Sequence, residues 1–443
     1  MMNFKGNTVH TSMSFKAALL GGVLFVAQIS GASAAGLVDE LSALMADHQK
    51  IKAAEADLAA ARANVEVANG GYYPTASITA NVGNEHISTH NPTGTRTETS
   101  MAQREVDLSL TQTVWDFGAT TATVDGSKLA VDQAQATLKQ TRQGLLLAAL
   151  SAQLNVASAK RVLDHQSKSE ASIKRQTELE DARVQRGSGF ATDTLQAKTQ
   201  LAGAQAARVR AEGALRQALN RYRAVFGAPP ADIAGLELPN IKAITLPASE
   251  EEVVTTALDN NPQVKISAIQ VDIADSEISR VHAAGYRPVI SASAEQKYKR
   301  DVGGTLGVKN ERLVKVEATF DFNMGWTAAN TLLASKSGYA ASNSRLKDTR
   351  DQIEEQARNA WQSLVTARAN ADFLKNQANI AGEFLDLARK ERTLGQRSLI
   401  DVLSGETSLI NALAAADRAE TDVAIATVAV LNVMGQLDLS VLK

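Results

Sequence analysis

The stretch RSLIDVLSGETSLI, residues 397–410, holds a pair of charged side chains whose spacing could serve a function. Arg397 opens it, and Asp401 follows as a carboxylate among apolar neighbours. Ser398 stands three residues before Asp401, the spacing at which a serine caps a helix and an acid occupies the first turn. Two interpretations stay open: a local helix cap, or a charge belonging to a site that several chains assemble.

The rest of the chain offers little for catalysis. Cysteine is absent, which excludes disulfides, cysteine–zinc sites and a lipidated N-terminal cysteine. The histidines are scattered, without metal-ligand spacing on one helix face. There is no G-x-S-x-G and no P-loop. We therefore expect no catalytic residue, no metal and no cofactor, and we do not expect an enzyme.

Composition narrows the class of protein further. Of 443 residues, 44% are hydrophobic and 21% charged, as in a folded protein, and the formal net charge of −2 gives no electrostatic case for nucleic acid. Aromatic residues make up only 4%, and alanine is abundant, which favours long, closely packed helices.

The N-terminus has the pattern of a secretory signal peptide over residues 1–34. Lys5 and Lys16 precede the apolar run AALLGGVLFVAQIS, and Ala32-Ser33-Ala34 forms an A-x-A cleavage site. An uncleaved membrane anchor is the alternative. No later segment has about 18 consecutive apolar residues, so we expect no transmembrane helix in the mature chain.

The mature chain reads as one pattern that occurs twice. The motif Gly-Tyr-x-Pro at 71–74 recurs at 285–288, and RGSGFATDTLQAKTQL (186–201) aligns with LGQRSLIDVLSGETSL (394–409). This alignment places Asp193 opposite Asp401. The predicted organisation is a first structural repeat at 35–227, a proline-rich linker at 228–248, a second repeat at 249–436 and a tail at 437–443.

Each repeat contains two segments in which apolar and polar residues alternate, which predicts strands. We place the strands at about 72–88, 101–117, 287–299 and 310–323, with outward loops at 86–100 and 299–310. One apolar and one charged face suit a membrane barrel, although a soluble sheet with one wet face has the same pattern. Aromatic residues gather at the strand ends, where an interfacial girdle belongs: Tyr72, Tyr73, Trp115, Phe117, Tyr286, Phe320, Phe322 and Trp326.

Four strands cannot close a barrel, and open strand edges are not tolerated in lipid. If the strands enter a membrane, several chains must therefore share one barrel, and three chains would supply twelve strands. Proline-free segments complete the repeats and predict long helices, at 119–185, 190–226, 327–393 and 398–435.

This layout resembles the TolC family of outer-membrane channel-tunnels. The resemblance rests on the duplicated unit, the Gly-Tyr-x-Pro strand entry, the VWDFG strand exit at 114–118 and the glycine-centred helix breaks. It implies a mainly helical fold with a membrane β-barrel, in which a homotrimer forms one 12-stranded barrel and an α-helical tunnel. It also implies the outer membrane of a Gram-negative bacterium as the location, with the tunnel in the periplasm and outer-membrane lipid around the barrel.

Segments of the second repeat, among them FLDLARKERTLGQRSLIDVLSGETSLINA, are similar to outer-membrane components of type I secretion systems that export large adhesins. That branch implies an exported protein substrate, a periplasmic membrane-fusion adaptor protein and an inner-membrane ABC transporter. The alternatives are the outer-membrane channel of an RND-type multidrug efflux pump and, more remotely, a helical surface protein without a transport function.

The resemblance also assigns roles at the helix breaks. Asp401 matches a carboxylate that rings the closed pore, and Ser404 stands at the second ring position, where the family has another acid. Arg397 and Asp193 match the partners of a gate bridge between chains, for which two solvated charges are the alternative. Gly187, Ser188, Gly189 and Gly395 match the tips that meet the adaptor, although turn geometry alone would also require glycine there.

Overall fold

A computed structural model describes residues 36–90, 92, 94–188, 190–230, 232–233 and 246–442. The predicted signal peptide, most of the linker at 228–248 and Gly189 lie outside these residues. The first series of elements is α1 (Leu37–Asp47), α2 (Gln49–Asn69), η1 (Gly70–Tyr72), β1 (Thr75–His90), β2 (Arg96–Trp115), α3 (Ala119–Gln185) and α4 (Ala191–Phe226). The second series is α5 (Glu250–Asn260), α6 (Pro262–Tyr286), β3 (Val289–Val302), β4 (Thr305–Thr319), α7 (Thr327–Thr393) and α8 (Leu399–Val433), followed by η3 (Leu439–Leu442).

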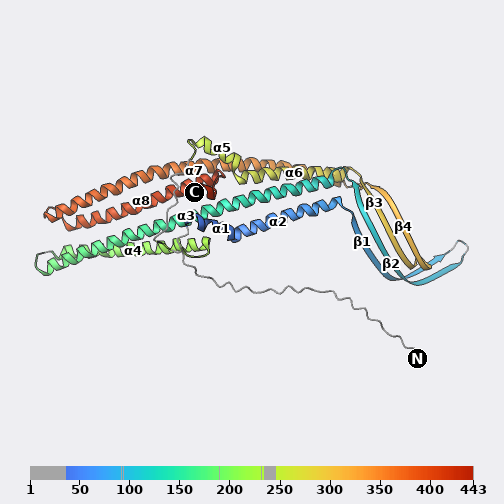
Figure 1. Cartoon of the computed structure of the whole chain (residues 1–443), viewed down its shortest axis with the longest axis horizontal. Helices are drawn as coiled ribbons and strands as arrows, with labels where there is room; N and C mark the ends of the chain where they lie inside the picture. Colours follow the sequence, from blue (N-terminus) through green and yellow to red (C-terminus); the bar gives the residue numbers. More distant parts are fainter. Residues whose placement is uncertain are drawn as a thin grey trace, which may run out of the picture. The chain divides into compact units, whose positions relative to one another are not determined.

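The two series have the same order of elements, as a duplicated unit predicts. A broken helical segment enters the sheet, two strands follow, and a helix of 67 residues leads away in both α3 and α7. At a rise of about 1.5 Å per residue, each of these helices extends for about 100 Å. Figure 1 shows the helices lying lengthwise, with the sheet at one end and the α3–α4 and α7–α8 turns at the other.

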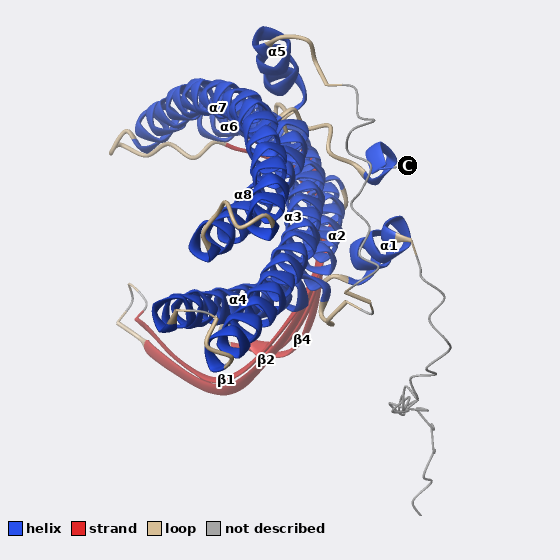
Figure 2. Cartoon of the chain, turned by 90° about the vertical axis from the view of Figure 1, so that its left-hand side faces the viewer, coloured by secondary structure: helices blue, strands red, loops and turns tan. Residues whose placement is uncertain are grey.

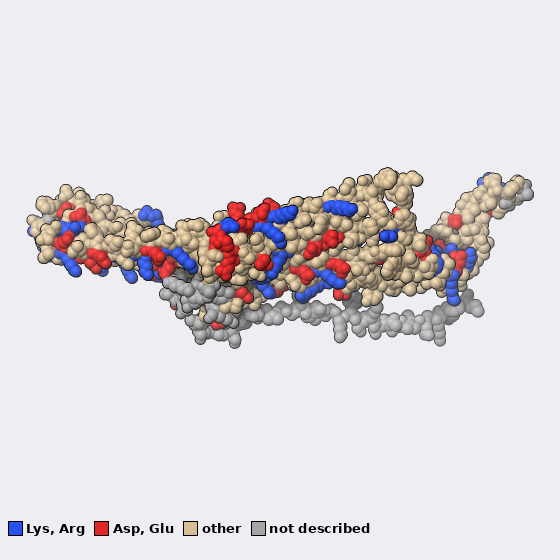
Figure 3. All heavy atoms as spheres, turned by 90° about the horizontal axis from the view of Figure 1, so that it is seen from above, with Lys and Arg blue, Asp and Glu red and all other residues tan. Residues whose placement is uncertain are grey.

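Apolar and small side chains hold the helices together in several separate clusters along their length. One cluster joins α1, α2 and α3 through residues such as Leu41, Ile51 and Leu150, and a second joins α5, α7 and α8 around Val253 and Leu364. A long helical bundle has no single centre, so its core is distributed in this way. Acidic and basic side chains alternate over the helical surface seen in Figure 3, without a large patch of one sign.

α8 is the one helix of the described residues that is long and apolar enough to cross a membrane by length and composition. Its apolar side chains already have partners inside the bundle. Val428 and Leu431 belong to the cluster that joins α1, α2 and α3, while Leu399 and Leu403 pack against α3 and α4 at the opposite end. We attribute the hydropathy of α8 to this packing.

The strands form one antiparallel sheet in the order β1-β2-β3-β4, curved as Figure 2 shows. Both hairpins extend further than the sequence predicted. The last residue pair before the turn is His90 with Arg96 in the first hairpin and Val302 with Thr305 in the second. The predicted loops at 86–100 and 299–310 are therefore wrong in extent: an antiparallel ladder is a backbone structure and continues through polar, threonine-rich sequence.

The two faces of the sheet differ as the alternation predicted. Apolar side chains predominate on one face, and many of them are exposed in the single chain, such as Val82 at 80% and Val314 at 82%. The other face carries acids and lysines that pair across strands, such as Lys299 with Glu105 at 3.4 Å and with Glu311 at 2.9 Å. An exposed apolar face of this size needs a non-aqueous surrounding or a partner.

Candidate pore constriction and docking tips

The two long helices end at the far tip in the same C-terminal motif. After α3, Gly187 has φ +76°, its N–H donates to the Val184 carbonyl, and Ser188 N–H donates to the Arg183 carbonyl. After α7, Gly395 has φ +75° and the corresponding bonds recur. This is the Schellman pattern, which requires a left-handed residue and therefore favours glycine. Turn geometry is thus a sufficient reason for both glycines.

The helices that follow the two turns begin differently. Ser398 is the N-cap of α8, and its Oγ accepts a hydrogen bond from the Asp401 backbone N–H at 3.2 Å. Phe190 occupies the N-cap of α4 and makes no side-chain cap. The predicted cap at Ser398 is confirmed, whereas the helix that carries Asp193 begins without one. The cap uses the backbone of Asp401, which leaves the carboxylate available for another role.

Asp401 lies on the accessible side of an otherwise buried helix start. Leu399 and Leu403 are buried against Ile173 of α3 and Ala197 of α4. The exposed residues in the first three turns of α8 follow at helical spacing, namely Asp401, Ser404, Ser408 and Asn411. The apolar neighbours of Asp401 therefore anchor the helix, while a narrow polar stripe that begins at Asp401 faces outward.

Arg397 has partners within its own chain. Its Nε lies 2.7 Å from Glu391 Oε2, and its guanidinium lies over the Phe384 ring, 5.3 Å from the centroid. Asp193 is half-buried and has no side-chain partner within the described part of the chain. The single chain does not bring Arg397 and Asp193 together; a bridge between chains stays a prediction.

The structure adds a buried ionic contact that the sequence did not indicate. Glu180, near the end of α3, is 5% exposed and accepts hydrogen bonds from Arg183 at 2.7 Å and from Arg392 of α7 at 3.0 Å. Arg392 also donates to the Arg397 carbonyl at 3.2 Å. The contact joins the two helical hairpins near the tip, and because its partners are 212 residues apart, no local motif marks it.

Glu406, one turn and a half beyond Asp401, is buried and bonded to Arg389 of α7 at 2.5 Å. Its carboxylate is therefore held inside the α7–α8 hairpin. Glu406 therefore does not take the place of the acid missing at Ser404.

At the other end of the helices, the predicted girdle residues all lie where the sheet joins the helices. They are exposed, and the Trp115 and Phe117 rings meet edge to face at 5.9 Å. Between these two residues, Asp116 accepts hydrogen bonds from the Gly118 N–H at 3.1 Å and from the Thr120 N–H at 2.7 Å. Partial burial raises the pKa of Asp116, but the hydrogen bonds from Thr120 and Gly118 outweigh it and keep the pKa below its ordinary value.

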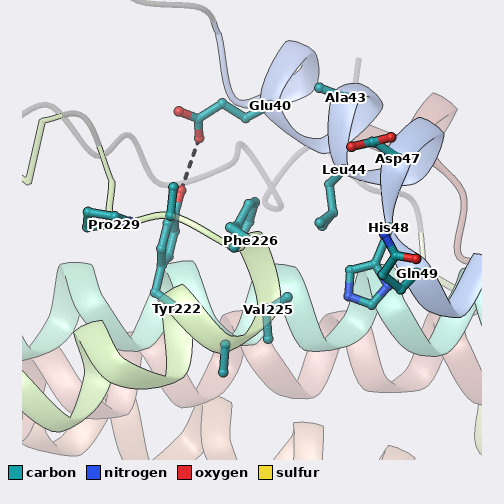
Figure 4. A pocket seen from close by; sticks show the side chains of 13 residues that line it. Glu40, Ala43, Leu44, Asp47, His48, Gln49, Tyr222, Val225, Phe226 and Pro229 are labelled. Atoms are coloured by element: carbon teal, nitrogen blue, oxygen red, sulfur yellow. Dashed lines mark hydrogen bonds between the residues drawn. The ribbon is translucent and has the colours of Figure 1, made fainter. Parts of the chain in front are cut away.

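A cavity of about 650 Å³ lies between α1 and the end of α4. Figure 4 shows Tyr222 pointing toward Glu40, with the hydroxyl donating to Glu40 Oε2 at 3.3 Å. Burial and the nearby Glu40 carboxylate raise the pKa of the Tyr222 hydroxyl. His48 is already used as the N-cap of α2, accepting from the Lys50 N–H. The groups around this cavity thus hold α1 against α4 and do not form a catalytic set.

The comparisons with known proteins agree with this architecture. The sequence model of the outer membrane efflux protein family matches residues 41–228. The chain is 25% identical to the outer membrane efflux protein BepC of Brucella suis over 84% of this chain and 79% of that protein. The family model and these relatives support a TolC-family outer membrane efflux protein.

Two further proteins are similar to this chain over most of its length. The chain is 24% identical to the alkaline protease secretion protein AprF of Pseudomonas aeruginosa, over 71% of this chain and 66% of that one. The crystal structure of the outer membrane protein VceC from Vibrio cholerae superimposes with a TM-score of 0.75 at 17% identity, covering 89% of this chain and 95% of that one. This structural likeness shows the shared fold.

The TolC-family assignment explains the single-chain features. Channels of the family are trimers that work with periplasmic adaptors and inner-membrane transporters, and they form an α-helical tunnel and a β-barrel. The chain is thus an outer-membrane efflux channel of a tripartite system, extending into the periplasm, and belongs to a transport family without enzymatic activity. The exposed apolar face of the sheet is the face that meets lipid.

Proposed function

We propose that this channel is the exit duct of a type I protein secretion system, passing a large adhesin-like protein from an inner-membrane ABC transporter and its adaptor to the exterior. The observation that carries the proposal is the likeness to AprF, a protein named for protease secretion, across 71% of this chain. The similarity of the second repeat's sequence to outer-membrane components that export adhesins supports the same branch.

Asp401 is proposed as the pore constriction, with three copies forming one acidic ring. The supporting observations are its exposure at the tip, the polar stripe that it begins, and the absence of a side-chain partner among the described residues. Ser404 lies one turn further along this stripe, at the second ring position. The chain therefore supplies a carboxylate at the first ring position and a serine at the second. Neighbouring carboxylates at a narrow axis repel one another and attract cations.

Arg397 and Asp193 are proposed as a gate bridge between neighbouring chains. To form it, Arg397 must turn from its present partner Glu391, or bind both acids, and guanidinium has enough donors for either. In this proposal Glu391 holds the arginine when the bridge is open.

The two Schellman turns are proposed as the adaptor-docking tips. Beside Gly187 and Gly395, the side chains of Phe190 and Leu394 are 75% and 73% exposed. Apolar side chains presented on rigid helix ends suit an apolar groove on a partner. The glycines shape the tips, and the neighbouring apolar residues supply most of the contact area.

A drug-efflux duct is the second candidate, favoured by the name of BepC, an efflux protein similar over 84% of this chain. Deleting the gene and measuring two properties separates the candidates: the amount of large secreted protein on the cell surface, and susceptibility to drugs. We expect the surface protein to be lost and drug susceptibility to stay unchanged, and we expect the wild-type gene to restore the surface protein. Increased susceptibility with normal secretion would reject the secretion proposal.

A further inference from the structure

The apolar face of the sheet ends, at the side away from the helices, in a row with two arginines. Arg104 of β2 lies directly opposite Arg300 of β3, and Val82 and Val308 flank the pair on β1 and β4. Because alternate residues of a strand share a face, both arginines lie on the same face as the exposed apolar side chains. This face is the one that meets lipid.

Two like charges directly opposite each other on one face destabilise strand pairing. The side chain of Arg300 is 64% exposed, and among the described residues its Nε contacts the carboxylate of the adjacent Asp301 at 3.6 Å. Arg104 has no ion pair or side-chain hydrogen bond within the described residues. On the opposite face, by contrast, Lys299 is bound by two glutamates from neighbouring strands. Lys299 on the water-facing side thus has close carboxylate partners from neighbouring strands, whereas Arg104 and Arg300 share one long contact to a carboxylate.

The position of the pair along the strands corresponds to a membrane boundary. Ile290 pairs with Trp115 of the aromatic girdle, and Arg300 lies ten residues further along β3. Ten residues at about 3.3 Å span about 33 Å, or about 25 Å along the normal for strands tilted by about 40°, which is the height of an outer-membrane apolar band. The girdle residues mark the periplasmic boundary, so Arg104 and Arg300 lie at the outer one.

We propose that Arg104 and Arg300 together bind a phosphate group of the phosphorylated glycolipid that forms the outer leaflet. Two guanidinium groups can surround one phosphate with several charge-assisted hydrogen bonds, and the anion removes the repulsion between them. Arg312 pairs with Gln296 on the same face, four residues deeper along β3 than Arg300. Four residues span about 13 Å, so Arg312 is too far away to share a phosphate with this pair and is not part of the site. Each protomer of the trimer would carry one such site.

The test is equilibrium binding of diphosphoryl lipid A to the full-length trimer in a non-ionic detergent, measured by native mass spectrometry. We expect the double variant Arg104→Gln/Arg300→Gln to bind about tenfold more weakly or worse, since charge-assisted hydrogen bonds are among the stronger ones. The matched control, Lys309→Gln/Lys315→Gln, removes the same charge from the water-facing side of the sheet and should bind normally. Lipid A without phosphates should bind the wild-type protein as weakly as diphosphoryl lipid A binds the double variant.

The substitution removes a repulsion between strands, so we expect the double variant to assemble, which heat-modifiable trimer migration checks. The single variant Arg104→Gln should show an intermediate loss. Three results would overturn the proposal: unchanged binding by the double variant, as expected if the arginines only extend into water; an equal loss in the lysine control; or equally tight binding of phosphatidylglycerol by the wild-type protein.

Discussion

Asp401→Asn separates a pore ring from a helix cap because the structure assigns the cap to another group. The capping bond runs from the Asp401 backbone N–H to Ser398 Oγ, and the substitution leaves both atoms in place. The Asp401 carboxylate is exposed and has no side-chain partner among the described residues, so folding loses only its interaction with the helix dipole, about 0.3–1 kcal/mol. We expect a stable trimer whose stability is close to that of the wild-type protein.

The effect on an ion in the pore should be larger. At an effective dielectric constant of about 20, a cation about 10 Å from one carboxylate gains about 1.7 kcal/mol, and three copies give about 5 kcal/mol. Screening over a Debye length of about 10 Å at 0.1 M salt reduces this to about 2 kcal/mol. An energy of this size raises the local cation concentration about thirtyfold, which is sufficient to determine cation selectivity.

The assay is the reversal potential of single channels in a planar bilayer under a potassium chloride gradient. Asp401→Asn should shift the reversal potential strongly toward zero. Ser398→Ala is the matched control, since it removes the cap at a cost of about 1 kcal/mol in stability but keeps the charge, and it should leave selectivity unchanged. An unshifted reversal potential for Asp401→Asn would refute the ring, and a shift of equal size for Ser398→Ala would show that selectivity depends on the fold of the tip.

Two further outcomes follow from the hydrogen bonds described above. Asp116→Ala should lower the free energy of unfolding by about 1–2 kcal/mol at pH 7. Because the pKa of Asp116 is lowered in the folded state, this difference should be fully present above the unfolded pKa and should vanish as the pH falls through the folded pKa. Thermal unfolding across a pH series measures this dependence. Glu180→Gln and Arg392→Met, combined in a double-mutant cycle, should show a coupling of about 1–3 kcal/mol, and additive effects in chemical denaturation would show that the buried contact contributes nothing.

The sequence predicted best those features that neighbouring residues determine. Gly187 and Gly395 mark the helix breaks because only a left-handed residue closes the Schellman turn, and Ser398 caps α8 because the cap spans three residues. The alternation of apolar and polar residues predicted the strands, since it records which face is wet. The sequence did not predict the full length of the strands, because backbone pairing continues beyond the point where apolar and polar residues cease to alternate.

What the sequence could not show depends on pairing between distant segments. Glu180 and Arg392 are two ordinary charged helix residues until α3 and α7 pack together. Arg104 and Arg300 are likewise unremarked until the register of β2 and β3 places them opposite each other. In both cases the role of each residue depends on a partner that is distant in the sequence, and no spacing along the chain reveals that partner.

The two ends of the molecule are connected by a single requirement. The sheet ends in β1 and β4, whose outer edges have no strand partner within the described residues, and lipid cannot satisfy their backbone groups. The trimer of this family removes both edges, because β4 of one chain can pair with β1 of the next around a closed barrel. The same threefold axis runs on through the helices to the tip, where it would convert the one exposed carboxylate of Asp401 into three. The open edges of the sheet are therefore the structural reason why a residue that a single chain would use only as a surface charge can serve as the constriction of a pore.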